Sequence, residues 1–158
     1  MQLAQVNVAR AVTRLDSPRL QGFADLYGPL DELARVSPGF VWRPQLSDLD
    51  IRELAVFGDL SRVVPNLSVW ESIEALRDYV YGSAHREALR RRAEWFLRPA
   101  AASTALWWVP DGERPSCAEA HRRLQLLRTE GPTAEAFTLA RPYPPPQADP
   151  AQAAPAQV

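Results

Sequence analysis

The sequence predicts an α+β fold in which four short strands and two long helical segments follow one another in the order βαββαβ. Three kinds of observation predict it: alternating polarity at residues 2–11, 63–70 and 104–109, helical periodicity between these segments, and capping residues where the helices begin. This order is that of the ferredoxin-like split βαβ motif. It implies a four-stranded antiparallel sheet that its helices cover on one face.

The first strand is expected at residues 2–11, with Ala4 and Val6 on an apolar face that should contact the helices. Ser17 and Pro18 begin the first helix, because serine is a favourable N-cap and proline is tolerated in the first helical turn. The buried stripe of this helix is expected to consist of Phe23, Leu26, Tyr27, Leu30, Leu33 and Ala34.

A second strand is expected at residues 40–45 and a third at residues 63–70, with an irregular segment at residues 46–62 between them. A serine cap after the third strand begins a helical segment at residues 72–97, which should pause near Gly82. The spacing predicts one inward stripe on its second half, formed by His85, Leu89, Arg92 and Phe96.

The fourth strand, at residues 104–109, contains two adjacent tryptophans, so one indole should lie on each face of the sheet. A last long helix begins at Ser116, and one further helical turn is expected at residues 133–138. We place one domain at residues 1–141. The remainder, residues 142–158, is rich in proline, alanine and glutamine, and we expect it to be a disordered tail.

The composition excludes several classes of function. A net charge of −1 gives no field that would attract nucleic acid or an anionic membrane. The chain has no lysine, which excludes lysine Schiff-base chemistry, and a single cysteine, Cys117, which excludes an internal disulfide. No histidine spacing typical of a metal site occurs, and no apolar run is long enough to cross a bilayer. We expect a cytoplasmic protein without a metal site.

One face of the predicted sheet is both aromatic and polar. It carries Gln5, Asn7, Asn66, Ser68, Trp70 and one indole of the pair Trp107 and Trp108. Such a surface is too aromatic to lie in water and too polar for a dry core. We therefore expect a second copy of the chain to cover it, so that a homodimer encloses a cavity for a small aromatic or apolar ligand.

The segments NLSVWES, SAHR, WWVP and GPTAEAFT…RPYPPP resemble an uncharacterised bacterial domain family of the dimeric α+β barrel superfamily. The resemblance extends to about Pro146. The superfamily includes antibiotic-biosynthesis-monooxygenase-like and haem-degrading monooxygenase proteins. It implies two sheets pairing as a barrel, and a monooxygenase-like activity without a dedicated cofactor or, alternatively, haem binding.

The resemblance also implies roles for single residues. Asn7 matches the first-strand asparagine of the haem-degrading members, and Tyr79 takes the place of an aromatic residue in their helix. Their histidine corresponds to a position near Leu89, about one turn after His85. Quinone-forming members without a cofactor use asparagine and aromatic side chains to bind a phenol for oxidation by oxygen, and Asn66 is among the residues compatible with that use.

Seven residues are candidates for the site. We assign catalytic roles to His85, Asn66 and Trp70, and substrate-binding roles to Asn7, Ser68, Tyr79 and Arg92. His85 would move a proton, or it would be a buried histidine bonded to a neighbouring carbonyl or carboxylate. Arg92 would hold an anionic substrate or pair with an acidic side chain.

Three functions are compatible with these residues. The first is a small-molecule-binding enzyme of the cofactor-independent monooxygenase type that acts on an aromatic or apolar substrate. The second is a non-catalytic ligand-binding or accessory protein on the same scaffold. The third is a haem-binding protein with His85 as the iron ligand.

Overall fold

The computed structural model describes residues 1–45 and 49–147, and its centre is a four-stranded antiparallel sheet in the order β2–β3–β1–β4. The strands are β1 (Gln2–Arg10), β2 (Phe40–Trp42), β3 (Val63–Trp70) and β4 (Thr104–Val109). Because β3 lies between β1 and β2 and is antiparallel to both, β1 and β2 run parallel to each other. This is the split βαβ arrangement, and the predicted α+β fold class is confirmed.

The helical elements follow the capping signals in the sequence. They are η1 (Pro18–Leu20), α1 (Gln21–Val36), α2 (Ile51–Leu54), η3 (Ala55–Phe57), α3 (Ile73–Tyr81), α4 (Ser83–Trp95) and α5 (Cys117–Glu130). The hydroxyls of Ser17, Ser72 and Ser116 each accept a hydrogen bond from a backbone N–H of the first turn. Gly82, with an extended backbone, separates α3 from α4 as predicted. Among the described residues, no helix combines the length and hydropathy that a membrane crossing needs.

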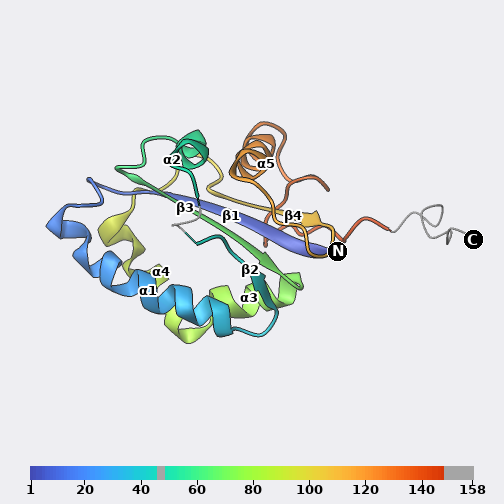
Figure 1. Cartoon of the computed structure of the whole chain (residues 1–158), viewed down its shortest axis with the longest axis horizontal. Helices are drawn as coiled ribbons and strands as arrows, with labels where there is room; N and C mark the ends of the chain where they lie inside the picture. The colour runs from blue at the N-terminus through green and yellow to red at the C-terminus, as the bar shows by residue number, and fades with distance from the viewer. Residues whose placement is uncertain (46–48, 148–158) are drawn as a thin grey trace, which may run out of the picture.

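Helices lie on both faces of the sheet, so the prediction of one uncovered face is wrong (Figure 1). The connections β1–α1–β2 and β3–α3–α4–β4 each join parallel strands. Since such crossovers are right-handed, both place their helices on the same side of the sheet. That side is the polar face with Asn7 and Asn66, and not the apolar face that the sequence favoured.

The apolar face is covered by α5, with α2 and η3 beside it (Figure 1). Its buried cluster joins strand residues to the apolar stripe of α5 and consists mainly of Ala4, Val6, Leu67, Val69, Trp107, Ala120, Leu124 and Leu127. Full burial of a leucine or valine side chain contributes about 1.5–3 kcal/mol, so this cluster stabilises the sheet and α5 together. A second copy of the chain is therefore not needed to cover either face.

The segment after α5 is not helical, which corrects the turn expected at residues 133–138. Phe137 instead pairs with Leu106 of the edge strand β4, through backbone hydrogen bonds of 2.8 and 2.9 Å in both directions. The side chain of Phe137 is fully buried. The free energy gained by pairing with an edge strand and burying an aromatic ring exceeds what one isolated helical turn would contribute.

The described part of the predicted tail, residues 142–147, contains no helix or strand, and Tyr143 attaches it to the domain. The indole nitrogen of Trp108 donates to the Tyr143 carbonyl at 2.9 Å, and the Tyr143 hydroxyl donates to the carbonyl of Pro132 at 3.0 Å. The rest of the tail expected to be disordered, residues 148–158, lies outside the described residues. So do residues 46–48 of the segment expected to be irregular.

Candidate functional site

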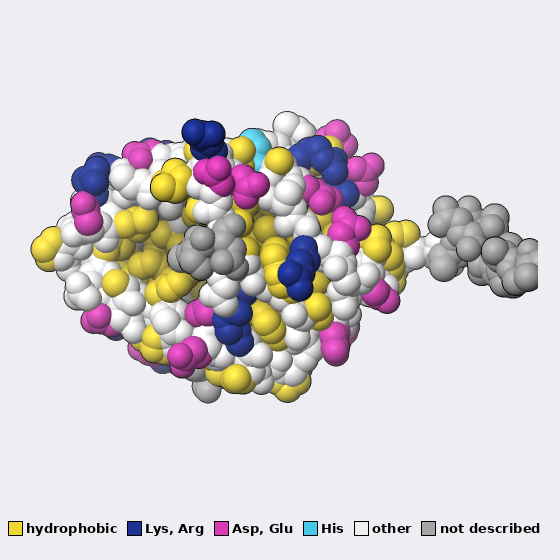
Figure 2. Space-filling view, viewed as in Figure 1, with side chains coloured by type: hydrophobic (Ala, Val, Ile, Leu, Met, Phe, Trp, Pro, Cys, Tyr) yellow, Lys and Arg dark blue, Asp and Glu magenta, His cyan; other side chains and the backbone are white. Residues whose placement is uncertain are grey.

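A cavity lies between the polar face of the sheet and helices α1, α3 and α4, and it consists of two adjoining chambers. The smaller chamber has a volume of about 130 Å³ and the larger one of about 400 Å³. Both are lined by Asn7, Arg43, Asn66, Tyr79, His85, Leu89 and Arg92. On the molecular surface, hydrophobic side chains gather in a hollow beside β3 and α1 (Figure 2). The larger volume is in the range of small-ligand pockets.

The polar floor of the cavity is a row of side chains on three neighbouring strands. Asn7 of β1 is the direct cross-strand partner of Asn66 on β3 and of Thr104 on β4. The amide nitrogen of Asn7 donates to the Thr104 hydroxyl at 2.6 Å. The register therefore brings both predicted asparagines to one place, because directly opposite residues share a face of the sheet.

Arg43 is a buried cation at the cavity wall that the sequence analysis did not include in the site. Its side chain is 8% exposed, and one of its terminal nitrogens lies 2.6 Å from a carboxylate oxygen of Asp31 on α1. Its other terminal nitrogen donates to the side-chain oxygen of Asn66 at 2.9 Å. Asp31 also accepts a hydrogen bond from Arg35 at 2.8 Å. Ion pair and hydrogen bond together fix the orientation of Asn66.

His85, in the first turn of α4, lines both chambers. Its Nδ1 lies 2.9 Å from the carbonyl oxygen of Val80, and since a carbonyl only accepts, Nδ1 carries the proton. Nε2 is then the basic nitrogen of the neutral ring. Burial lowers the pKa of His85 below its ordinary value of 6.5, and the Val80 hydrogen bond partly offsets this effect. At pH 7 the imidazole is therefore neutral and can accept a proton.

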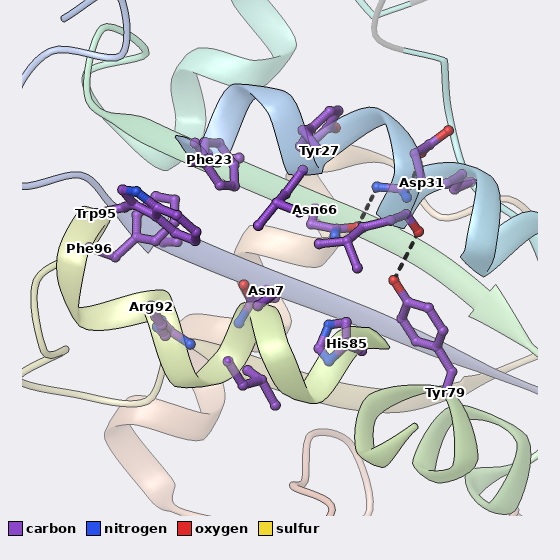
Figure 3. Close-up of a pocket in the computed structure, with 17 residues that line it drawn as sticks. Asn7, Phe23, Tyr27, Asp31, Asn66, Tyr79, His85, Arg92, Trp95 and Phe96 are labelled. Atoms are coloured by element: carbon purple, nitrogen blue, oxygen red, sulfur yellow. Dashed lines mark hydrogen bonds and ion pairs between the residues drawn. The ribbon is translucent and has the colours of Figure 1, made fainter. Parts of the chain in front are cut away.

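Tyr79 of α3 forms the wall next to His85 (Figure 3). The two ring centroids are 4.8 Å apart. Tyr79 also stacks on Trp70, with a centroid distance of 5.1 Å. The Tyr79 hydroxyl donates to the carbonyl of Leu30 on α1 at 3.2 Å. Burial raises the pKa of Tyr79, so its hydroxyl stays protonated at neutral pH.

Trp70 is 1% exposed, and its contacts hold it in place as part of the wall of the larger chamber. Its indole nitrogen donates to the hydroxyl of Ser68 at 2.9 Å, and that hydroxyl donates to the side-chain oxygen of Gln5 at the same distance. Phe40 packs edge-on against the indole. Ser68 therefore holds Trp70 in place, and Trp70 in turn positions Tyr79.

The other end of the cavity is aromatic. Phe23 of α1 contacts Phe96 edge to face, with centroids 4.8 Å apart, and Trp95 at 6.0 Å (Figure 3). All three rings line the smaller chamber. Arg92 reaches the same cavity from α4, and among the described residues no carboxylate lies within ion-pair distance of it.

All seven residues predicted from the sequence line the larger chamber: Asn7, Asn66, Ser68, Trp70, Tyr79, His85 and Arg92. The predicted inward stripe of the second helix is confirmed, because His85, Leu89, Arg92 and Phe96 all face the smaller chamber. Sequence reasoning missed Arg43 and Asp31. Asp31, Arg43 and Asn66 are separated from one another by many residues in the sequence. No local pattern therefore indicates that they are in contact.

In the part of the chain that the structure describes, no group of three histidine, cysteine or acidic side chains is placed to hold a metal ion. The polar groups of the cavity are amides, guanidinium groups, hydroxyls, the carboxylate of Asp31 and the neutral imidazole of His85. Such a set can bind and orient a polar ligand and accept one proton.

A family described as a domain of unknown function, DUF3291, matches residues 2–153. No curated protein matches the sequence. Among solved structures, SnoaB, a cofactor-independent oxygenase from Streptomyces nogalater, is similar with 14% identity and a TM-score of 0.49, over 70% of this chain and 94% of SnoaB. A candidate antibiotic biosynthesis monooxygenase from Chloroflexus aurantiacus J-10-fl is similar with 16% identity and a TM-score of 0.42, over 73% of this chain and 98% of that protein.

Proposed function

This chain belongs to the DUF3291 family, and we propose that it binds a small aromatic molecule in its cavity and promotes oxidation of that molecule by oxygen without a bound cofactor. The observation that carries the proposal is the 2.9 Å contact between His85 Nδ1 and the Val80 carbonyl. It leaves a basic Nε2 in a cavity whose walls are aromatic and whose floor is polar.

The proposed reaction begins with proton transfer from a phenolic hydroxyl to Nε2 of His85. The phenolate is far easier to oxidise than the phenol, and the imidazolium that forms at His85 would stabilise its negative charge. The ring then gives four electrons to O₂. One oxygen atom becomes the second carbonyl of a quinone, and the other leaves as water together with two hydrogens of the substrate.

In this proposal Tyr79, which packs against both His85 and Trp70, orients the imidazole of His85, and Trp70 with Ser68 holds Tyr79 in place. The role of Trp70 is therefore positioning, since its indole nitrogen already donates to Ser68 and its ring contacts Tyr79 and Phe40. Such positioning contributes to catalysis because holding the reacting groups in the right orientation lowers the activation barrier.

A suitable test substrate is 1-naphthol, which reacts with one O₂ to give 1,4-naphthoquinone and one water. Quinone formation would be followed by absorbance, and mass spectrometry after reaction under ¹⁸O₂ should find one labelled oxygen in the quinone. We expect His85→Gln to lower kcat by about 10²–10⁴-fold, the usual contribution of a general base. The control is His121→Gln, since His121 lies on α5 next to Phe57, on the opposite side of the sheet.

If 1-naphthol raises the melting temperature of the protein but no quinone forms, the chain is a non-catalytic binding protein on the same scaffold. If 1-naphthol neither binds nor reacts, the proposed function is wrong.

Haem binding is the second candidate, because the hydrogen bond of Nδ1 to a carbonyl is the arrangement typical of a metal-ligating histidine. His85 would be the iron ligand, and the iron would supply the redox chemistry. Purified protein with a Soret absorbance that disappears in His85→Ala would support it. A colourless protein that takes up no added haemin would exclude it.

Homodimer formation and a cytoplasmic location stay predictions. Since both faces of the sheet are covered within one chain, a second copy would have to dock on another surface. Sedimentation at micromolar concentration distinguishes a monomer from a dimer.

A further inference from the structure

We infer that the natural ligand is an aromatic carboxylic acid that binds with its carboxylate between Arg92, Asn7 and Asn66 and its ring against Phe23, Trp95 and Phe96. This inference rests on the proposed function and specifies its substrate as a phenol that also carries a carboxylate.

Polar and apolar side chains are unevenly distributed along the cavity. The residues common to both chambers are nearly all polar, with Leu89 as the exception. The lining that belongs to the smaller chamber alone is mostly apolar: Ala9, Phe23, Leu26, Leu30, Val64, Ala88, Trp95 and Phe96, together with Tyr27 and Asp31. Figure 3 shows the aromatic group at one end and Arg92, Asn7 and Asn66 beside it. A complementary ligand therefore has an apolar ring at one end and a polar group next to it.

The charges around the cavity also favour an anionic ligand. Asp31 lies between two arginines, Arg43 at 2.6 Å and Arg35 at 2.8 Å, so one carboxylate is shared by two cations. Within the described residues, Arg92 has no carboxylate within ion-pair distance. The cavity therefore has an excess of positive charge, and His85, which is neutral, does not change it. A polar group that brings one negative charge compensates this excess.

Two asparagine amides lie on the sheet at the floor of the cavity. Asn7 and Asn66 are direct cross-strand partners, and both line the same cavity as Arg92 (Figure 3). Among the described residues, the amide nitrogen of Asn66 has no hydrogen-bond partner, whereas its oxygen accepts from Arg43. An N–H donor beside a guanidinium group is a complementary pair for the two oxygens of a carboxylate.

The test compares 2-naphthoate with 2-naphthamide, which have the same shape and differ in charge, by isothermal titration calorimetry at pH 7.5. We expect naphthoate to bind about tenfold more tightly than naphthamide, as a charge-assisted contact predicts. Arg92→Gln should remove this preference while naphthamide affinity stays within about twofold. The control is Arg90→Gln, since Arg90 is 70% exposed on the same helix and pairs with Glu87.

A second variant tests the charge argument through a gain of affinity. Asp31→Asn keeps the shape of the side chain and removes the one carboxylate that the described residues contribute to the cavity lining. Naphthoate should therefore bind about threefold more tightly. Circular dichroism would show that each variant is folded. Equal affinity for naphthoate and naphthamide overturns this inference but leaves the proposed function standing, whereas absence of binding by both probes overturns the two together.

Discussion

The guanidinium group of Arg43 donates a hydrogen bond of 2.9 Å to the side-chain oxygen of Asn66 while it forms an ion pair of 2.6 Å with Asp31. One buried side chain thus connects strand β3 with helix α1 across the edge of the cavity. Its contacts fix an asparagine of the proposed site, and they also hold the helix against the sheet.

Replacing Arg43 by methionine should lower the free energy of unfolding by roughly 2–3 kcal/mol, because it leaves a partly buried carboxylate with one cation fewer. The loss stays below the value for a fully buried pair because Asp31 keeps its contact with Arg35. Urea denaturation measures it. The matched change Arg90→Met breaks an exposed pair and should cost less than about 1 kcal/mol. Equal losses in the two variants would contradict the role of Arg43.

His85 should make the stability of the protein depend on pH. Its pKa in the folded state lies below 6.5, the value for an exposed histidine, so the unfolded chain binds the proton first as the pH falls. The stabilising contribution is present above pH 6.5 and is lost as the pH falls through the lower folded pKa. Between pH 7.5 and pH 5, wild-type protein should therefore lose more stability than His85→Gln. Parallel pH profiles of the two proteins would contradict a buried, neutral His85.

The turn between α1 and β2 should require glycine at position 39 for two separate reasons. Gly39 has a φ of +78°, and a Cβ atom there would lie 2.5 Å from Cβ of Ala75 on α3. Gly39→Ala should therefore destabilise the protein by more than the roughly 1–3 kcal/mol of a left-handed residue alone. Gly112→Ala is the control, because Gly112 has a φ of +80° with no atom within 4 Å. Thermal or urea unfolding that shows equal effects would contradict the close contact of the turn with α3.

Much of the fold follows from local patterns in the sequence. Strands at 63–70 and 104–109 have the bounds that alternation predicts, and Ser72 and Ser116 cap helices where the pattern places them. Local signals suffice here because side-chain alternation and capping depend on neighbouring residues. Phe137 was misjudged because its partner, Leu106, lies far away in the sequence.

Several residues of the cavity lining were predictable from the sequence, but the enclosure of the cavity by helices was not. Asn7, Asn66 and Tyr79 line one cavity. This could be predicted because the sequence pattern indicates which face of its strand or helix each residue occupies. Arg43 was missed because its role depends on contacts with Asp31 and Asn66, which only the tertiary fold creates. The side of the sheet on which the helices lie follows from the handedness of the crossovers, which alternation of polarity does not encode.

The central claim is that one chain encloses an aromatic-binding cavity between the polar face of its sheet and helices α1, α3 and α4. The most direct measurement is a titration of ¹⁵N-labelled protein with 1-naphthol, observed by NMR at side-chain N–H groups. We predict shifts for the amides of Asn7 and Asn66 and for the indole of Trp95, with no shift for the indole of Trp107, which is buried on the opposite face. Shifts at Trp107 with the asparagine amides unchanged would contradict the account.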